Sequence, residues 1–106
     1  IKSLGRKAEI IVAPAKGGRV DLRRALKILA QREITAMLIE GGAALVGAAL
    51  KEGLVDKMMV YVAPRIMGEG LEAVRGLRVR RLDEALVLKR VSAGKIGEDI
   101  LIEGYL

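Results

Sequence analysis

An apolar stretch that ends in two glycines constrains the fold of this chain more than any other feature. Residues 36–39 (Ala-Met-Leu-Ile) are apolar at every position, which is typical of a strand covered on both faces and therefore of a parallel sheet. Gly41 and Gly42 follow and turn the chain. Residues 43–52 have the small and apolar composition of a helix packed closely on a sheet, and Gly53 is suited to a left-handed C-cap. The sequence therefore predicts a strand, a sharp turn and a helix in succession.

The segments on either side continue this alternation. Residues 9–13 are a short apolar stretch that ends at Pro14, so we expect a first strand there. Asp21 is a good helix N-cap, and apolar residues recur at helical spacing over Leu22–Gln31. Lys57–Val62 is expected to form a third strand. The order strand–helix–strand–helix–strand is typical of right-handed parallel crossovers.

The C-terminal part of the chain has a different pattern. Residues 86–91 and 99–104 are two strand-like segments with a glycine-containing turn between them, so we expect an antiparallel hairpin and a mixed sheet. With 52% hydrophobic residues, 106 residues can bury one core, and residues 1–106 are expected to form a single domain. The predicted fold class is α/β, with a mostly parallel sheet and a C-terminal antiparallel hairpin.

The composition excludes several kinds of chemistry. The chain has no cysteine and no histidine, which excludes disulfides, thiolate metal sites and a histidine general base. Catalysis must use carboxylates, lysines, hydroxyls or a cofactor that carries the reaction. A net charge of +6 favours anionic partners, among them phosphorylated metabolites, dinucleotides and nucleic acid. No secretory signal is visible, so a cytoplasmic location without membrane partners is expected.

The strand–glycine–helix junction is the candidate binding site. Glycine lets a ligand approach the main chain, and the amides of a helix that begins at Ala43 offer a site for phosphate. Glu40 stands at the end of the strand, where open α/β sheets bind ligands, and can accept hydrogen bonds from hydroxyl or amino groups. A tight turn in which local amides satisfy Glu40 is the structural alternative, and the junction alone leaves both open.

Four motifs in register extend the interpretation to nearly the whole chain from Val20 onward. They are Val20-Asp-Leu, Leu38-Ile-Glu-Gly-Gly-Ala-Ala-Leu45, residues 53–68 (GLVDKMMVYVAPRIMG) and Gly97-Glu-Asp-Ile-Leu-Ile-Glu-Gly104. In this order they resemble the C-terminal part of the reductase domain of the riboflavin deaminase-reductase family. The resemblance implies a dihydrofolate-reductase-like, three-layer αβα fold, of which this chain holds a partial domain.

The resemblance also implies a reaction and its residues. NADPH would give hydride to C1′ of a ribosylamino pyrimidine 5′-phosphate, which becomes a ribitylamino group. By position, Glu40 corresponds to a substrate-contacting carboxylate, and the peptide between the two glycines is expected to be unusual, such as a cis peptide. The residues that correspond to NADPH contacts are Gly41, Gly42, Ala43, Ala44, Leu45, Val46, Gly47 and Ala48.

The family resemblance further implies partners. The first part of the family domain, which supplies further substrate contacts and recognises the adenosine 2′-phosphate, has no counterpart in this sequence. An open sheet edge or uncovered face would then invite another chain. We therefore expect a homodimer that uses residues 86–106 or an exposed edge, and the N-terminal part of the domain is a further candidate partner.

Other charged residues have a solvated-surface explanation. The basic cluster Arg75, Arg78, Arg80 and Arg81 fits a phosphate or nucleic-acid patch, but no aromatic residue is interleaved with it for base stacking. Arg65 is a weaker candidate for the cofactor crevice, and surface turns explain the acidic residues Asp83, Glu84, Glu98 and Asp99 better than a metal site does. Three functions stay open: the reductase, a non-catalytic binding or assembly module with an incomplete site, and a basic nucleic-acid-binding domain.

Overall fold

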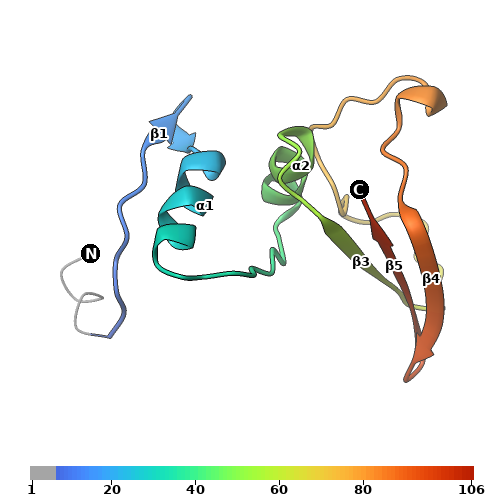
Figure 1. Ribbon diagram of the computed structural model, residues 1–106. Coiled ribbons are helices and arrows are strands. Elements are labelled where there is room, and N and C mark those ends of the chain that lie inside the picture. Colours follow the sequence, from blue (N-terminus) through green and yellow to red (C-terminus); the bar gives the residue numbers. More distant parts are fainter. Residues whose placement is uncertain (1–6) are drawn as a thin grey trace. The chain divides into compact units, whose positions relative to one another are not determined.

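The computed structural model describes residues 7–106, which divide into two compact units on either side of the bond after Leu38 (Figure 1). The first unit contains the short strands β1 (Ala15–Lys16) and β2 (Arg19–Val20) and the helix α1 (Leu22–Gln31). The second contains α2 (Ala43–Lys51), the 3₁₀ helix η2 (Leu82–Glu84), and the strands β3 (Lys57–Val62), β4 (Lys89–Ile96) and β5 (Asp99–Tyr105). No helix in this part of the chain is long and apolar enough to cross a membrane.

A side-chain cap and a glycine turn define the first unit. The Oδ1 atom of Asp21 accepts a hydrogen bond from the amide of Arg24 at 3.0 Å, so the predicted N-cap of α1 is confirmed. Gly17 and Gly18, with φ of 59° and 74°, form the two-residue loop between β1 and β2. Positive φ at both loop positions is what favours a Gly-Gly dipeptide in a tight hairpin. The sequence predicts only a loop here, although this dipeptide is itself a hairpin signal.

Two predicted strands are not formed in the described part of the chain. Residues 9–13 and 36–39 belong to no strand, and every strand pairing within residues 7–106 is antiparallel. The predicted parallel crossovers and mostly parallel sheet are therefore not found there. An apolar composition suits a segment to a sheet, but a strand also needs a neighbour whose backbone groups pair with its own. In this structure, no strand among residues 7–106 pairs with residues 9–13 or with residues 36–39.

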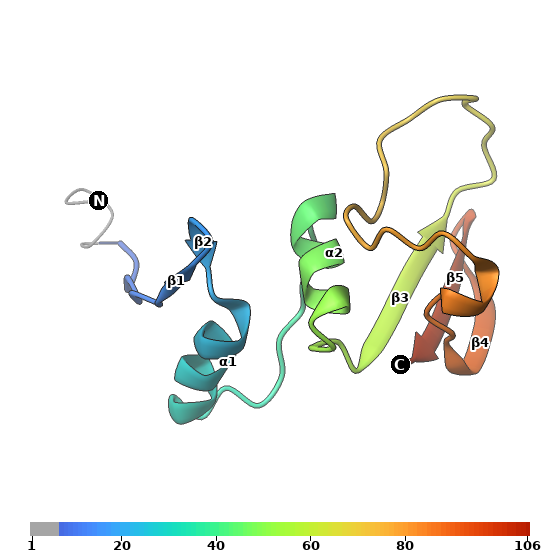
Figure 2. The ribbon, with the colours of Figure 1, turned by 90° about the horizontal axis from the view of Figure 1, so that it is seen from above.

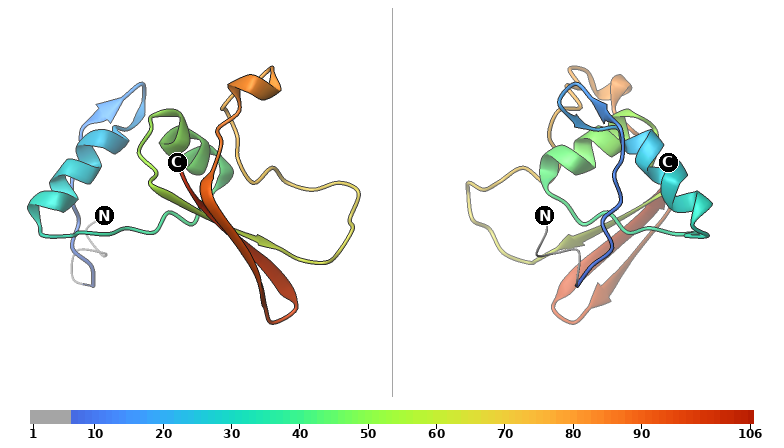
Figure 3. Two further views of the ribbon diagram at one scale, coloured as in Figure 1. Left: turned by 45° about the vertical axis from the view of Figure 1, so that its right-hand side comes forward. Right: turned by 90° about the vertical axis from the view of Figure 1, so that its left-hand side faces the viewer.

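The second unit is built on a three-stranded antiparallel sheet in the order β3-β5-β4 (Figure 1). Figure 3 shows the β4–β5 hairpin of this sheet in orange and red. β3 has the predicted bounds and pairs with β5 along its whole length, from Lys57 opposite Tyr105 to Val62 opposite Ile100. β4 and β5 form the predicted C-terminal hairpin around Gly97 and Glu98. β4, however, covers residues 89–96 instead of 86–91. Pairing with β5 extends the ladder through Ser92-Ala93-Gly94, a stretch whose side chains carry no apolar alternation.

Only a few side chains form the core of the second unit. Ala49 and Leu50 of α2 and Leu101 of β5 are 1%, 5% and 8% exposed, and they are the buried apolar side chains among the described residues. Gly104 of β5 is also buried, and a Cβ there would lie 2.7 Å from the Cβ of Leu88. Large apolar side chains that are almost fully exposed include Ile66, Met67, Leu71 and Leu82. Much apolar surface is therefore uncovered, which agrees with the uncovered face expected for a partial domain.

Charged groups gather around Tyr105 near the end of β5. The guanidinium of Arg90 lies 4.2 Å from the centre of the Tyr105 ring, and the Nζ of Lys57 lies 5.7 Å from it. Lys57 also forms an ion pair with Glu103 at 2.6 Å, and this hydrogen bond raises the pKa of the Lys57 ammonium. These contacts join β3, β4 and β5 at one end of the sheet.

Candidate functional site

The double glycine lies directly before α2, as the sequence predicts. The Gly41–Gly42 peptide is cis, and Gly41 has a φ of 139°, a conformation that favours glycine. Gly42 is the N-cap of α2 and has no side chain with which to cap it. Its carbonyl accepts hydrogen bonds from the amides of Leu45 and Val46, at 3.0 and 3.1 Å. The amides of Ala43 and Ala44, in the first turn of α2, have no acceptor within the helix, so they are available to an anion.

An open pocket of about 470 Å³ lies at this end of α2. Its walls come from two segments that are distant in the sequence: Gly42, Ala43, Ala44 and Leu45 from the start of α2, and Leu71, Glu72 and Arg75 from the loop after β3. Figure 2 shows how they meet, because this loop leaves the end of β3 and returns to the N-terminal end of α2. The amide of Arg75 donates to the carbonyl of Ala43 at 3.1 Å and holds the loop to the first turn of the helix.

The charged groups around the pocket have opposite effects on a bound anion. The Nε of Arg75 lies 2.9 Å from the Oε2 of Glu72, and the two side chains are 61% and 63% exposed. The cation and the positive end of α2 both favour an anion, whereas the Glu72 carboxylate disfavours one. Because the pair is solvent-exposed, water can replace either partner at low cost. A phosphate group could therefore take the place of Glu72 on Arg75.

The structure brings only some of the predicted site residues to the pocket. Gly42, Ala43, Ala44 and Leu45 line it, but Gly41, Val46, Gly47 and Ala48 do not. Glu40 is exposed just before the double glycine and is not in the lining either. The sequence interpretation did not assign Leu71, Glu72 or Arg75 to this site. These residues lie in an irregular loop, so no helical or strand periodicity in the sequence indicates that they reach the pocket.

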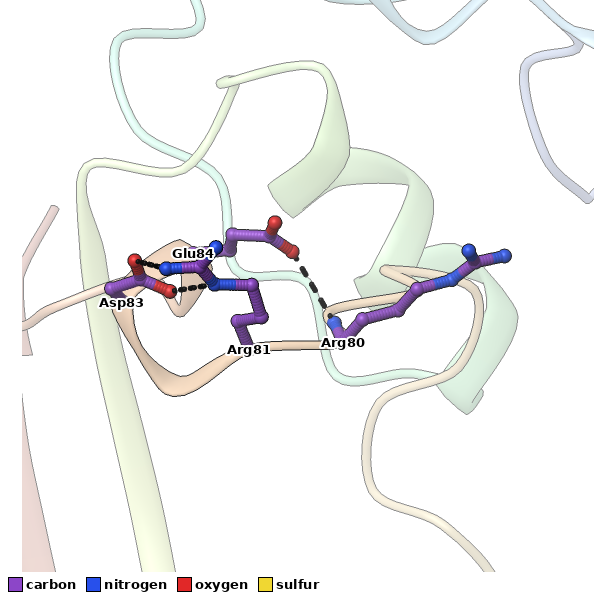
Figure 4. Close-up of polar contacts among 4 residues, drawn as sticks. All are labelled: Arg80, Arg81, Asp83 and Glu84. Carbon is purple, nitrogen blue, oxygen red and sulfur yellow. Dashed lines mark hydrogen bonds and ion pairs between the residues drawn. The ribbon is translucent and has the colours of Figure 1, made fainter.

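In the rest of the basic cluster, Arg81 pairs with a neighbouring carboxylate, and the main chain of Arg80 contacts another. Arg81 donates from Nε and Nη2 to the two carboxylate oxygens of Asp83, at 3.0 and 2.6 Å (Figure 4). The amide of Arg80 lies 3.4 Å from the Oε2 of Glu84. Arg78 and Arg80 are exposed, and neither they nor Arg65 line the pocket. This arrangement matches the predicted solvated segment, from which only Arg75 reaches the pocket.

Within the described residues, the fold and the site define an α/β protein with an antiparallel sheet and a pocket at the start of a glycine-capped helix. The model of the RibD C-terminal domain family matches residues 2–102. The chain belongs to the RibD C-terminal domain family, which confirms the resemblance found in its motifs.

Relatives with curated names support the same family. RibD of Actinobacillus pleuropneumoniae is 35% identical over 97 residues, which are 90% of this chain and 26% of that protein. The 2,5-diamino-6-ribosylamino-4(3H)-pyrimidinone 5′-phosphate reductase of Methanothermobacter thermautotrophicus is 32% identical over 105 residues, 97% of this chain and 48% of that protein. This chain therefore spans about a quarter of the first relative and about half of the second.

A solved structure extends the likeness to the fold. RibD of Acinetobacter baumannii, form 2, matches with a TM-score of 0.77 and 26% sequence identity. The match covers 99% of this chain and 28% of that one. It fits the dihydrofolate-reductase-like fold that the sequence motifs imply.

Proposed function

We propose that the protein containing this chain is an NADPH-dependent reductase of riboflavin biosynthesis that acts on a ribosylamino pyrimidine 5′-phosphate. The observation that carries the proposal is the match over 97% of the chain to a protein named as a pyrimidinone 5′-phosphate reductase. The chemistry suits the composition, because a bound cofactor that supplies hydride requires neither histidine nor cysteine from the protein.

The pocket at the start of α2 is the proposed NADPH site. NADPH, when bound, supplies the hydride for C1′ of the sugar. The amides of Ala43 and Ala44 would donate to its diphosphate. Because Gly42 has no side chain, the diphosphate can approach these amides. Arg75 would add a positive charge beside the same phosphates.

Glu40 is the proposed substrate contact. It is exposed two residues before the N-cap of α2 and can accept hydrogen bonds from substrate hydroxyl or amino groups. A carboxylate in this role orients the sugar for reduction and takes no proton itself, so it contributes by positioning.

The complete assembly is also a proposal. The exposed apolar side chains Ile66, Met67, Leu71 and Leu82 would be covered by further protein, and residues 9–13 and 36–39 would gain strand partners there. Such pairing would give the single, three-layer αβα domain with a largely parallel sheet.

The hairpin of residues 86–106, with Val91, Ile96 and Ile100 exposed, would pair with a second copy of the chain.

Replacing Glu40 tests the reaction and the substrate role together. In Glu40→Gln we expect the KM for the pyrimidine phosphate to rise by about tenfold, since a hydrogen bond to a charged group is worth roughly 1.5–3 kcal/mol. The Kd for NADPH should stay unchanged, because Glu40 is not in the pocket lining. The assay follows the loss of NADPH absorbance when the ribosylamino substrate is added.

Glu98→Gln, the same change at the tip of the β4–β5 hairpin, is the matched control and should leave both constants unchanged. An unaltered KM in Glu40→Gln would remove Glu40 from the substrate site. A wild-type protein that consumes no NADPH with this substrate would contradict the proposed reaction.

A further inference from the structure

Gly47 lies inside α2 at a point where the helix has no room for a side chain. A Cβ built on Gly47 would lie 1.7 Å from the carbonyl oxygen of Arg75 and 2.7 Å from its carbonyl carbon. Gly104 is the other described glycine with a contact below 3.0 Å, and its nearest neighbour is a side chain, that of Leu88. At Gly47 the three nearest atoms all belong to the Arg75 main chain, so only a shift of that segment or of α2 would make room for a side chain.

Helix stability does not explain a glycine at this position. Glycine in a helix interior is destabilising relative to alanine, because its backbone loses more freedom on folding. Its φ is not among the positive values of the chain, so backbone conformation does not require glycine here either. The remaining explanation for a glycine at position 47 is that the main chain of Arg75 lies close to the surface of α2 at this point.

We propose that Gly47 is a positioning residue, whose missing side chain lets residues 71–76 lie on α2 as the second wall of the NADPH pocket. This inference rests on the proposed function. It differs from the role implied by the family resemblance, in which Gly47 contacts NADPH. Gly47 is buried, the main chain of Arg75 covers it, and it is absent from the lining of the pocket.

The contact at Gly47 fixes the distance between the two walls. One turn earlier in α2, the carbonyl of Ala43 accepts from the Arg75 amide at 3.1 Å, so Arg75 is held to the helix at two points. Leu71 and Glu72 line the pocket on the same segment. If this segment moved outward, the Arg75 guanidinium would leave the vicinity of the Ala43 and Ala44 amides. Displacements of about 1 Å in a binding group are enough to cause large losses.

Comparison of Gly47→Ala with Gly70→Ala in the full-length protein tests the proposal. Gly70 stands next to the same segment, but a Cβ there meets no atom within 4 Å. We expect Gly47→Ala to raise the Kd for NADPH by roughly tenfold in a fluorescence titration. Trypsin should also cleave the bond after Arg75 faster, relative to cleavage after Arg78 in the same molecule. Gly70→Ala should change neither quantity, and both variants should keep the circular dichroism of the wild type.

A second measurement needs no variant. The Arg75 amide of the wild type should exchange its hydrogen more slowly than the amide of Gly76, and more slowly still when NADPH is bound. An unprotected Arg75 amide, or an unchanged cleavage rate in Gly47→Ala, would show that the segment is not docked and would overturn the proposal. Faster cleavage with an unchanged Kd would overturn the positioning role alone. A wild type that binds no NADPH would refute the proposed function. Trypsin cleavage after Arg75 and hydrogen exchange of its amide would still decide whether residues 71–76 are docked on α2.

Discussion

Gly42→Val is expected to raise the Kd for NADPH by more than tenfold, which corresponds to about 1.4 kcal/mol or more. The backbone of Gly42, with φ −76° and ψ −173°, is open to any residue, and a Cβ there would meet no atom within 4 Å. A Cβ at this position therefore meets no obstacle in the free protein. The branched side chain would stand at the pocket that Gly42 lines and block the approach of a diphosphate to the amides of Ala43 and Ala44.

Fluorescence titration of NADPH against the full-length variant measures this effect. Gly94→Val in β4 is the matched control, because a Cβ at Gly94 also meets no atom within 4 Å and Gly94 is not in the pocket lining. The control should bind NADPH as the wild type does. Unchanged affinity in Gly42→Val would remove the double glycine from the cofactor site.

Leu101→Ala is expected to lower the free energy of unfolding by about 2–5 kcal/mol, the usual cost of truncating a buried leucine. Leu101 is 8% exposed in β5, the central strand of the sheet, and it is one of few buried apolar side chains in the described residues. The cavity would open where β3 and β4 both pair with β5, so little of the surrounding structure can collapse into it.

Val62→Ala provides the control in the neighbouring strand, because Val62 is 42% exposed and pairs with Ile100, on the opposite face of the sheet from Leu101. We expect it to cost about 1 kcal/mol or less, in keeping with partial burial. Urea unfolding monitored by circular dichroism gives both values. Equal losses in the two variants would show that Leu101 is not a core residue.

The elements predicted correctly are those whose signals are local. The Asp21 cap, the periodic residues of α1 and the strand at β3 each depend on a short run of sequence. Gly53, with φ 64° just after α2, also takes the left-handed conformation expected of a C-cap glycine. Residues within a turn or two supply the contacts that fix the cap, the helix and Gly53, whereas β3 also needs its pairing with β5.

The features that were not predicted depend on distant parts of the chain. The apolar stretches at residues 9–13 and 36–39 have the composition of strands, but composition does not supply a partner. The second wall of the pocket comes from a loop about 30 residues beyond the double glycine, where nothing in the local pattern distinguishes Arg75 from its basic neighbours. The packing role of Gly47 could not be predicted either, because a glycine among alanines in a helix does not show what packs against it.

Transfer of deuterium from NADPH in which both hydrogens at C4 of the nicotinamide are replaced by deuterium decides whether this protein is the proposed reductase. The full-length protein would be incubated with labelled NADPH and the ribosylamino pyrimidine 5′-phosphate, and the product analysed by mass spectrometry and NMR. The proposed function predicts a ribitylamino product that carries deuterium at C1′. A ribitylamino product without the label, or no reduction at all under conditions in which NADPH is bound, would contradict it.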